Sequence, residues 1–183
     1  LTIQFPHSPW AAESQYRMGT AYRAMERWDE AATSYLRAGT LYSDTSWKNE
    51  GLLAAASLMA THGDKRKAIE TARQVLESDA AGSARSRAAF LIAGIQAETG
   101  EWEEALSLLN ALKERPLRSE DGPMARCRIG EVLMRMGRWE EALGEFQEIL
   151  RKTAGDTLKQ RAWFQSAVAE SWMGRRDEAM RAA

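Results

Sequence analysis

The chain has 183 residues, of which 44% are hydrophobic and 28% are charged, as expected for a folded protein rather than a disordered segment. Its formal net charge is -1, and basic and acidic residues interleave along the whole length, so no basic stripe favours nucleic acid as a partner. No apolar run approaches the roughly 20 residues of a membrane-spanning helix, which argues against membrane insertion by this segment.

The strongest feature of the sequence is an internal repeat of 37 residues. An alanine that follows a pair of charged residues recurs at this interval, as Ala31, Ala68, Ala105, Ala142 and Ala179. Five positions before it stand Gly63, Gly100, Gly137 and Gly174, with Glu26 in the first copy. Twelve positions before it a small residue recurs as Gly19, Ala56, Ala93, Gly130 and Ala167. Five copies in one phase predict a repeat protein.

Each copy contains two helical patterns separated by the recurring glycine. In the third copy, Ala89, Ile92 and Gln96 lie on one helical face, and Gly100 supplies the left-handed conformation that ends a helix. The spacing predicts helices over residues 12–25, 29–42, 48–61, 64–78, 84–98, 102–114, 122–136, 139–152, 157–173 and 175 onward. No strand pattern interrupts them, so the sequence predicts an all-α fold.

The register of the repeat also predicts how the chain is divided. The copies span residues 12–48, 49–85, 86–122 and 123–159, with an incomplete copy over residues 160–183. Trp10 lies 37 residues before Trp47, so residues 1–11 are interpreted as the tail of a preceding copy and its loop. Neither end carries the polar capping helix that usually finishes a solenoid. We therefore expect the chain to be a fragment of a longer array.

The 37-residue unit resembles the tetratricopeptide repeat. The likeness rests on the small residue of the first helix, the glycine at the turn, and the opening of the second helix, which reads WEEA at residues 102–105 and 139–142. It covers residues 12–183, although the usual period of the family is about 34 residues and the family prefers a large aromatic residue where Gln96 and Glu170 stand. The resemblance implies one right-handed α-solenoid of antiparallel helix pairs.

The resemblance further implies a partner-binding groove, because the first helices of this family line the concave wall that usually holds the ligand. Its first row of inward-facing positions is Tyr16, Leu53, Phe90, Cys127 and Phe164. A second row is Thr20, Ser57, Gly94, Glu131 and Val168, and beside it lie Arg23, Met134 and Trp172. The alternative interpretation, which the sequence leaves equally open, is that these side chains pack on the first helix of a neighbouring repeat.

The sequence offers no set of residues that predicts catalysis, a cofactor or a metal site. His7 and His62 do not stand at metal-ligand spacing from a cysteine, and no histidine is placed near Cys127 to activate its thiol. Tryptophan residues open three of the second helices, and we interpret them as packing residues. These are Trp28, Trp102 and Trp139, and Trp163 is assigned to the packing stripe of the fifth first helix.

We interpret the chain as a protein–protein interaction scaffold that holds a partner peptide or domain, and not as an enzyme. The alternative is a regulatory or spacer segment of a larger enzyme or signalling protein, acting by intramolecular docking or self-association. The loop at residues 5–9, FPHSP, and the long period are similar to bacterial cell-envelope members of the family, which implies a periplasmic or lipid-anchored parent. The single cysteine fits the cytoplasm equally well, so the compartment stays open.

Overall fold

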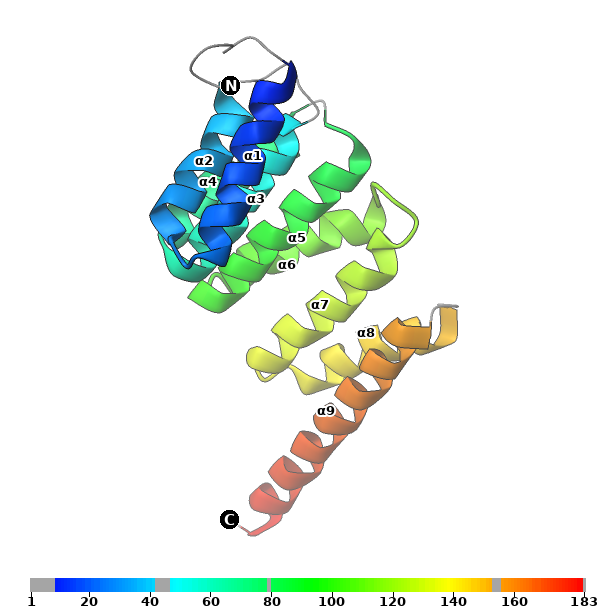
Figure 1. Ribbon diagram of the computed structural model, residues 1–183. Helices are drawn as coiled ribbons and strands as arrows, with labels where there is room; N and C mark the ends of the chain where they lie inside the picture. Colours follow the sequence, from blue (N-terminus) through cyan, green and yellow to red (C-terminus); the bar gives the residue numbers. More distant parts are fainter. Residues whose placement is uncertain (1–8, 42–46, 79, 153–155, 183) are drawn as a thin grey trace. The chain divides into compact units, whose positions relative to one another are not determined.

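A computed structural model of the chain describes residues 9–41, 47–78, 80–152 and 156–182. These ranges contain nine α-helices and no β-strand, which confirms the all-α prediction. The chain divides into two compact units, residues 1–95 and 96–183. The first unit holds α1 (Pro9–Ala24), α2 (Trp28–Thr40), α3 (Trp47–His62), α4 (Lys65–Leu76) and most of α5 (Gly82–Thr99) (Figure 1). The second holds the end of α5, α6 (Trp102–Glu114), α7 (Asp121–Arg135), α8 (Trp139–Lys152) and α9 (Asp156–Ala182).

Three of the helical hairpins turn through the same left-handed residue position. Glu26, Gly100 and Gly137 have φ angles of 59°, 85° and 73°. After each of the two glycines, the next amide donates to a carbonyl five residues earlier. Glu101 N donates to Gln96 O at 2.9 Å, and Arg138 N donates to Leu133 O at 2.9 Å. This is the hydrogen bond that closes a helix at a left-handed residue, so the predicted role of both glycines is confirmed.

The turn between α3 and α4 is built differently from the prediction. Gly63 does not adopt the left-handed conformation that its place in the repeat suggests. Instead, Asp64 caps α4, because its Oδ1 accepts hydrogen bonds from the amides of Arg66 at 2.9 Å and Lys67 at 3.2 Å. A side-chain cap satisfies amides that a helix start leaves unpaired, and the chain therefore reverses here without a left-handed residue.

Within a hairpin, the two helices cross at the small residues that recur in the sequence. A Cβ atom added to Gly19 would lie 2.6 Å from Cδ1 of Tyr35, and one added to Gly130 would lie 2.5 Å from Cε1 of Phe146. The alanines opposite, Ala31 in α2 and Ala142 in α8, are fully buried. The small side chains thus leave room for an aromatic ring of the second helix, as close packing of the pair requires.

A second close approach joins successive hairpins, and the sequence reading missed it. In the first unit, a Cβ added to Gly51 of α3 would lie 2.7 Å from the carbonyl oxygen of Tyr35 in α2. A Cβ on Gly39 would lie 2.7 Å from Cγ of Leu52. The positions equivalent to Gly51 in later copies are also small and fully buried, namely Ala88, Ala125 and Ala162. The repeat therefore contains two stripes of small residues, one within each hairpin and one between hairpins.

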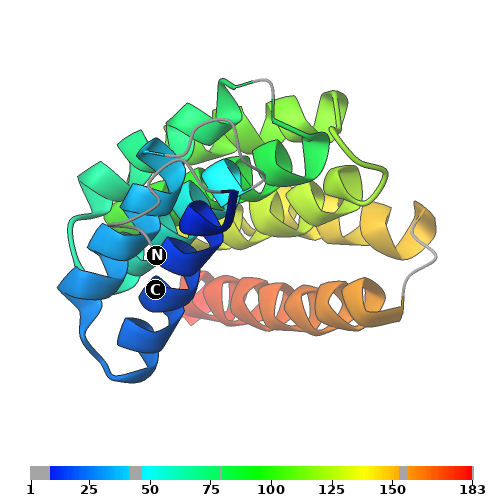
Figure 2. The same cartoon turned by 45° about the horizontal axis from the view of Figure 1, so that its top comes forward.

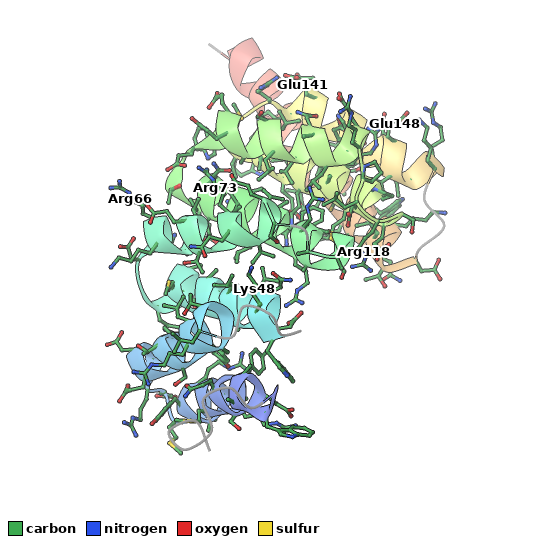
Figure 3. All side chains as sticks on the ribbon, turned by 90° about the horizontal axis from the view of Figure 1, so that it is seen from above. Lys48, Arg66, Arg73, Arg118, Glu141 and Glu148 are labelled. Carbon is green, nitrogen blue, oxygen red and sulfur yellow. The ribbon has the colours of Figure 1, made fainter. Side chains whose placement is uncertain are left out.

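In the second unit, one carboxylate connects three helices. Glu145 of α8 accepts hydrogen bonds from Nζ of Lys113 in α6 at 2.8 Å and from a terminal guanidinium nitrogen of Arg126 in α7 at 2.7 Å. All three side chains are mostly shielded from solvent. Other charged groups, such as Arg66 and Glu141, project into solvent (Figure 3). These two partly buried ion pairs link α8 to α6 and to α7.

The last helix differs from the prediction of two helices broken at Gly174. It runs without interruption from Asp156 to Ala182, and it lies beside α8 and α7 (Figure 2). A fold-back gains stability only when the second helix buries an apolar stripe, and residues 175–182 carry one large apolar residue, Met180. Continuing α9 through Gly174 keeps its backbone hydrogen bonds. The predicted helix that would fold back onto α9 is therefore not formed in the described residues.

Two side chains of α9 are exposed as a consequence. Trp163, predicted to lie in the packing stripe, is 70% exposed, and that assignment is wrong. Ala167, which stands at the small position of the crossing, is exposed too, whereas its equivalents Gly19, Ala56 and Gly130 are buried.

Among the described helices, none combines the length and the apolar composition needed to cross a bilayer.

Candidate functional site

The predicted first row in the first unit is largely a packing surface. Tyr16 lies between two aromatic rings, with centroid distances of 5.1 Å to Tyr35 and 5.0 Å to Trp47. Leu53 is only 3% exposed and belongs to a core cluster with Val75. Phe90 is half-buried. For Leu53, the alternative interpretation holds, since a buried side chain has no surface to offer a partner.

The second row in the same unit is open to solvent. Thr20, Arg23 and Ser57 are exposed, and Gly94 has nothing within 4 Å of an added Cβ. The hydroxyl of Thr20 accepts a hydrogen bond from that of Tyr35 at 3.2 Å, which fixes one polar group on this face. These residues are small or polar, so this part of the face provides space and hydrogen-bonding groups rather than apolar area.

In the second unit, Cys127 is almost completely buried, with 2% exposure, and its Sγ lies 3.9 Å from Oε1 of Glu131. Burial, together with the nearby Glu131 carboxylate, raises the pKa of the Cys127 thiol to about 11. A thiol that keeps its proton is a poor nucleophile and a poor metal ligand. Cys127 was expected to line the groove, but it contributes almost no exposed surface.

Glu131, in the second row, holds two arginines from different helices. Its Oε1 accepts a hydrogen bond from Nε of Arg161 in α9 at 2.8 Å, and its Oε2 accepts one from Arg128 in α7 at 3.3 Å. Glu131 is therefore a bridge between α7 and α9, and its charge is already matched. Met134, one helical turn further along, is half-buried.

The predicted residues of α9 form the most accessible apolar part of the site. Phe164 is 66% exposed, and Val168 is half-buried. Together with Ala167 and Ser171 they line a shallow depression of about 220 Å³. On α9, the predicted groove residues Phe164 and Val168, with Ala167 and Ser171, thus form a continuous, mostly apolar strip that is accessible to solvent.

Trp172 does not lie free on that strip. Its ring stacks on Trp139 at the start of α8, with the centroids 5.8 Å apart and the planes 10° from parallel. In the first unit Trp28 stacks in the same manner on His62, at 3.9 Å and 5°. Trp28 and Trp139 are therefore packing residues, as predicted. Trp172 is 47% exposed, so only its outer part remains available to a partner.

A larger cavity in the second unit was not anticipated from the sequence. It has a volume of about 750 Å³ and lies between the N-terminal parts of α7 and α9. Cys127, Met124 and Leu158 supply apolar lining, and Arg128 and Arg161 are among its polar residues. A signal was present, because Leu158 stands 111 residues, or three periods, after Trp47. The repeat alignment thus marks a place where a large ring is replaced by a smaller side chain.

Family models match most of the chain. A model described as a tetratricopeptide repeat-like domain matches residues 39–167, and a second one, described as a tetratricopeptide repeat, matches residues 13–45. No curated protein sequence matches the chain. The first match alone spans more than half of the 183 residues.

Solved structures share the fold at low sequence identity. The structure of MamA protein is 18% identical with a TM-score of 0.66, and the alignment covers 95% of this chain and 88% of that chain. Nearly identical TPR-like repeats assigned to a kinesin light chain of Podosopora anserina are 18% identical with a TM-score of 0.70, covering 96% and 92%. At such identity the likeness concerns the solenoid fold alone. The chain belongs to the tetratricopeptide repeat-like family.

Proposed function

We propose that this chain is a protein-interaction module that binds a partner polypeptide on the strip formed by Phe164, Val168 and neighbouring residues of α9. The fold of the family generally mediates protein–protein interaction. The observation that carries the proposal is the exposure of Phe164, at 66%, beside a depression lined by Ala167, Val168 and Ser171. Covering a phenylalanine side chain contributes about 1.5–3 kcal/mol, which makes Phe164 the main anchor.

The strip favours an apolar or weakly charged partner segment. No charged residue lines the depression, and Glu131 on the neighbouring helix is already bound to Arg128 and Arg161. Shape and apolar contact therefore supply the affinity, as when an amphipathic helix or an extended peptide lies in a shallow groove. The first unit offers a second, more polar face with mostly small side chains, which also contacts the partner in this proposal. Its residues are Thr20, Arg23, Ser57, Phe90 and Gly94.

The test compares two neighbouring aromatic residues of α9. Phe164→Glu places a charge on the proposed strip, and Trp163→Glu is the matched control, because Trp163 is similarly exposed, at 70%, and is about 100° around the helix. Both proteins should keep the helical circular dichroism of the parent. Partner capture from a lysate of the source cells should fall at least tenfold with Phe164→Glu and persist with Trp163→Glu. Equal capture by both variants would mean that the strip is not the binding surface.

Self-association is the second candidate function, favoured by the adjacent exposed rings of Trp163 and Phe164. Large apolar side chains exposed on one helix often mark a subunit contact. If α9 joins two copies, light scattering should give the mass of a dimer for the parent chain and of a monomer for Trp163→Glu or Phe164→Glu. A parent chain that is monomeric at high micromolar concentration would remove this candidate.

A further inference from the structure

The cavity beside Cys127 is larger than the depression on α9 and shares no lining residue with it. Its volume is about 750 Å³, against about 220 Å³ for the depression. Pro123 and Met124 of α7 and Leu158 of α9 give it apolar walls, and Cys127 is at the same wall as Met124. This size lies in the range of pockets that enclose small ligands.

The repeat shows what fills the same place elsewhere in the chain. Cys127 and Leu158 stand three periods of 37 residues after Tyr16 and Trp47. In the first unit those two residues bring aromatic rings together between α1 and α3, at a centroid distance of 5.0 Å. In the second unit the same two positions carry a thiol and an isobutyl group, and a cavity is present. The positions that carry aromatic rings in the first unit thus line a cavity in the second.

The next pair of the series closes the gap in another way. Leu53 and Ala84, one period after Tyr16 and Trp47, are both buried in one core cluster with Ala88. Small side chains at these positions thus do not by themselves leave space, since the helices there pack on each other directly. Between α7 and α9 a cavity remains beside Cys127, and the bridge from Glu131 to Arg161 connects the two helices next to it.

The two arginines in the lining, which also contains Glu120, Lys152 and Asp156, favour a ring over an aliphatic chain. Arg128 and Arg161 both line the cavity, and both bind the carboxylate of Glu131, at 3.3 Å and 2.8 Å. Sharing one carboxylate fixes the two guanidinium groups next to each other. A planar guanidinium stacks on an aromatic face and gains a cation–π attraction there, whereas an aliphatic side chain gains only apolar contact.

We propose that the cavity beside Cys127 is a recognition pocket for one aromatic side chain, tyrosine or tryptophan, of a partner polypeptide. The incoming ring takes the place that Tyr16 and Trp47 fill in the first unit, between the apolar wall at Met124 and Leu158 and the guanidinium groups of Arg128 and Arg161. This proposal rests on the proposed interaction function, because the ring comes from the partner polypeptide. It deepens that function by assigning the partner a specific aromatic anchor.

The experiment is an NMR titration of the whole chain with two uncharged probes, N-acetyl-tryptophanamide and N-acetyl-leucinamide. We expect the tryptophan probe to shift the backbone amide signals of Cys127 and Leu158 in a saturable manner. The leucine probe should bind about tenfold more weakly, because it lacks the ring that stacks on a guanidinium. Equal binding of both probes would overturn the aromatic preference. Shifts confined to α9 around Phe164 would overturn the pocket itself.

Three variants separate occupation of the cavity from a general change in structure. Cys127→Tyr and Leu158→Trp each introduce, from opposite walls, the ring that the first unit carries, and both should abolish the shifts caused by the tryptophan probe. Cys127→Ala leaves the cavity open and should bind the probe as the parent does. Circular dichroism checks that each variant folds. If one of the two cavity-filling variants fails to fold, probe binding to the other still tests the pocket. Undiminished binding to a folded filled variant would refute the pocket.

The outcome can be told apart from that of the proposed function. The probe titration needs no natural partner, and the capture assay compares Phe164→Glu with Trp163→Glu, neither of which lines this cavity. Loss of capture with Phe164→Glu together with no probe binding would reject the pocket and leave the interaction module standing. Probe binding together with equal capture by both α9 variants would move the binding surface from the strip to the pocket.

Discussion

Cys127 illustrates how a side chain that looks reactive is kept inert by its surroundings. Its burial removes water that would stabilise a thiolate, and the carboxylate of Glu131, 3.9 Å from Sγ, adds repulsion. Both effects favour the protonated form. The residue is therefore a protonated, weakly nucleophilic thiol at the wall of a cavity.

Stability should respond to the Cys127 proton in alkaline solution. The pKa of the thiol rises from an ordinary value of 9.0 to about 11 in the folded chain. Between these values the folded state binds more protons than the unfolded state, so the free energy of unfolding falls as pH rises through this window. Below pH 9 the thiol contributes no such change.

The measurement is urea unfolding of the parent and of Cys127→Ala at pH 8 and pH 10.5. Lysine and tyrosine residues titrate in the same range in both proteins, so the difference between the two isolates the thiol. The parent should lose more stability than the variant on going to the higher pH. Parallel losses would show that the pKa of Cys127 is not raised in the folded chain.

The helix pairs depend on a contact that a single methyl group would disturb. In the α7–α8 pair, Gly130 lies against the ring of Phe146, and an added Cβ would come within 2.5 Å of it. Phe146 is itself fully buried, so its ring cannot swing into solvent. The crossing distance of the two helices is set by this pair.

Gly130→Ala should lower the free energy of unfolding by about 1–3 kcal/mol, the usual cost of overpacking. Gly144→Ala is the matched control in the same hairpin, since an added Cβ there meets nothing within 4 Å. Because alanine is the better helix former, Gly144→Ala should raise the free energy of unfolding by about 0.5–1 kcal/mol. Urea unfolding measures both changes, and a Gly130→Ala protein as stable as the control would contradict the α7–α8 crossing.

For the whole molecule, the two compact units imply that stability is distributed along the chain. Each hairpin contacts its neighbours within its unit, such as α2 with α3 and α8 with α9. In repeat arrays the total stability is close to a sum of unit terms and neighbour terms. Damage in one hairpin should therefore remain local at first.

Hydrogen exchange followed by mass spectrometry tests this distribution. In the Gly130→Ala protein, amides of α7 and α8 should exchange faster than in the parent, because opening of their hairpin costs less free energy. Amides of α1 and α2, in the other unit, should exchange at the parental rate. A uniform acceleration over all described helices would indicate a single cooperative unit instead.

Much of the fold was determined by local signals in the sequence. The bounds predicted for α6 and α8, 102–114 and 139–152, coincide with those observed. Gly100 and Gly137 place the starts of α6 and α8, because each ends the preceding helix in the left-handed conformation that few other residues tolerate. The small residues at Gly19 and Gly130 were also recognisable, because a small residue recurs at this place in the repeat and the two helices cross closely there.

The exposure of each predicted site residue was decided only by tertiary structure. Leu53, Cys127 and Phe164 occupy one position of the repeat, yet two of them are buried and Phe164 is exposed. The period specifies which way a side chain points from its own helix, but burial depends on the volume and distance of the neighbouring helix. For the same reason the cavity at Cys127 required the structure, because the small side chains at Leu53 and Ala84 leave no such cavity where the neighbouring helices pack closely.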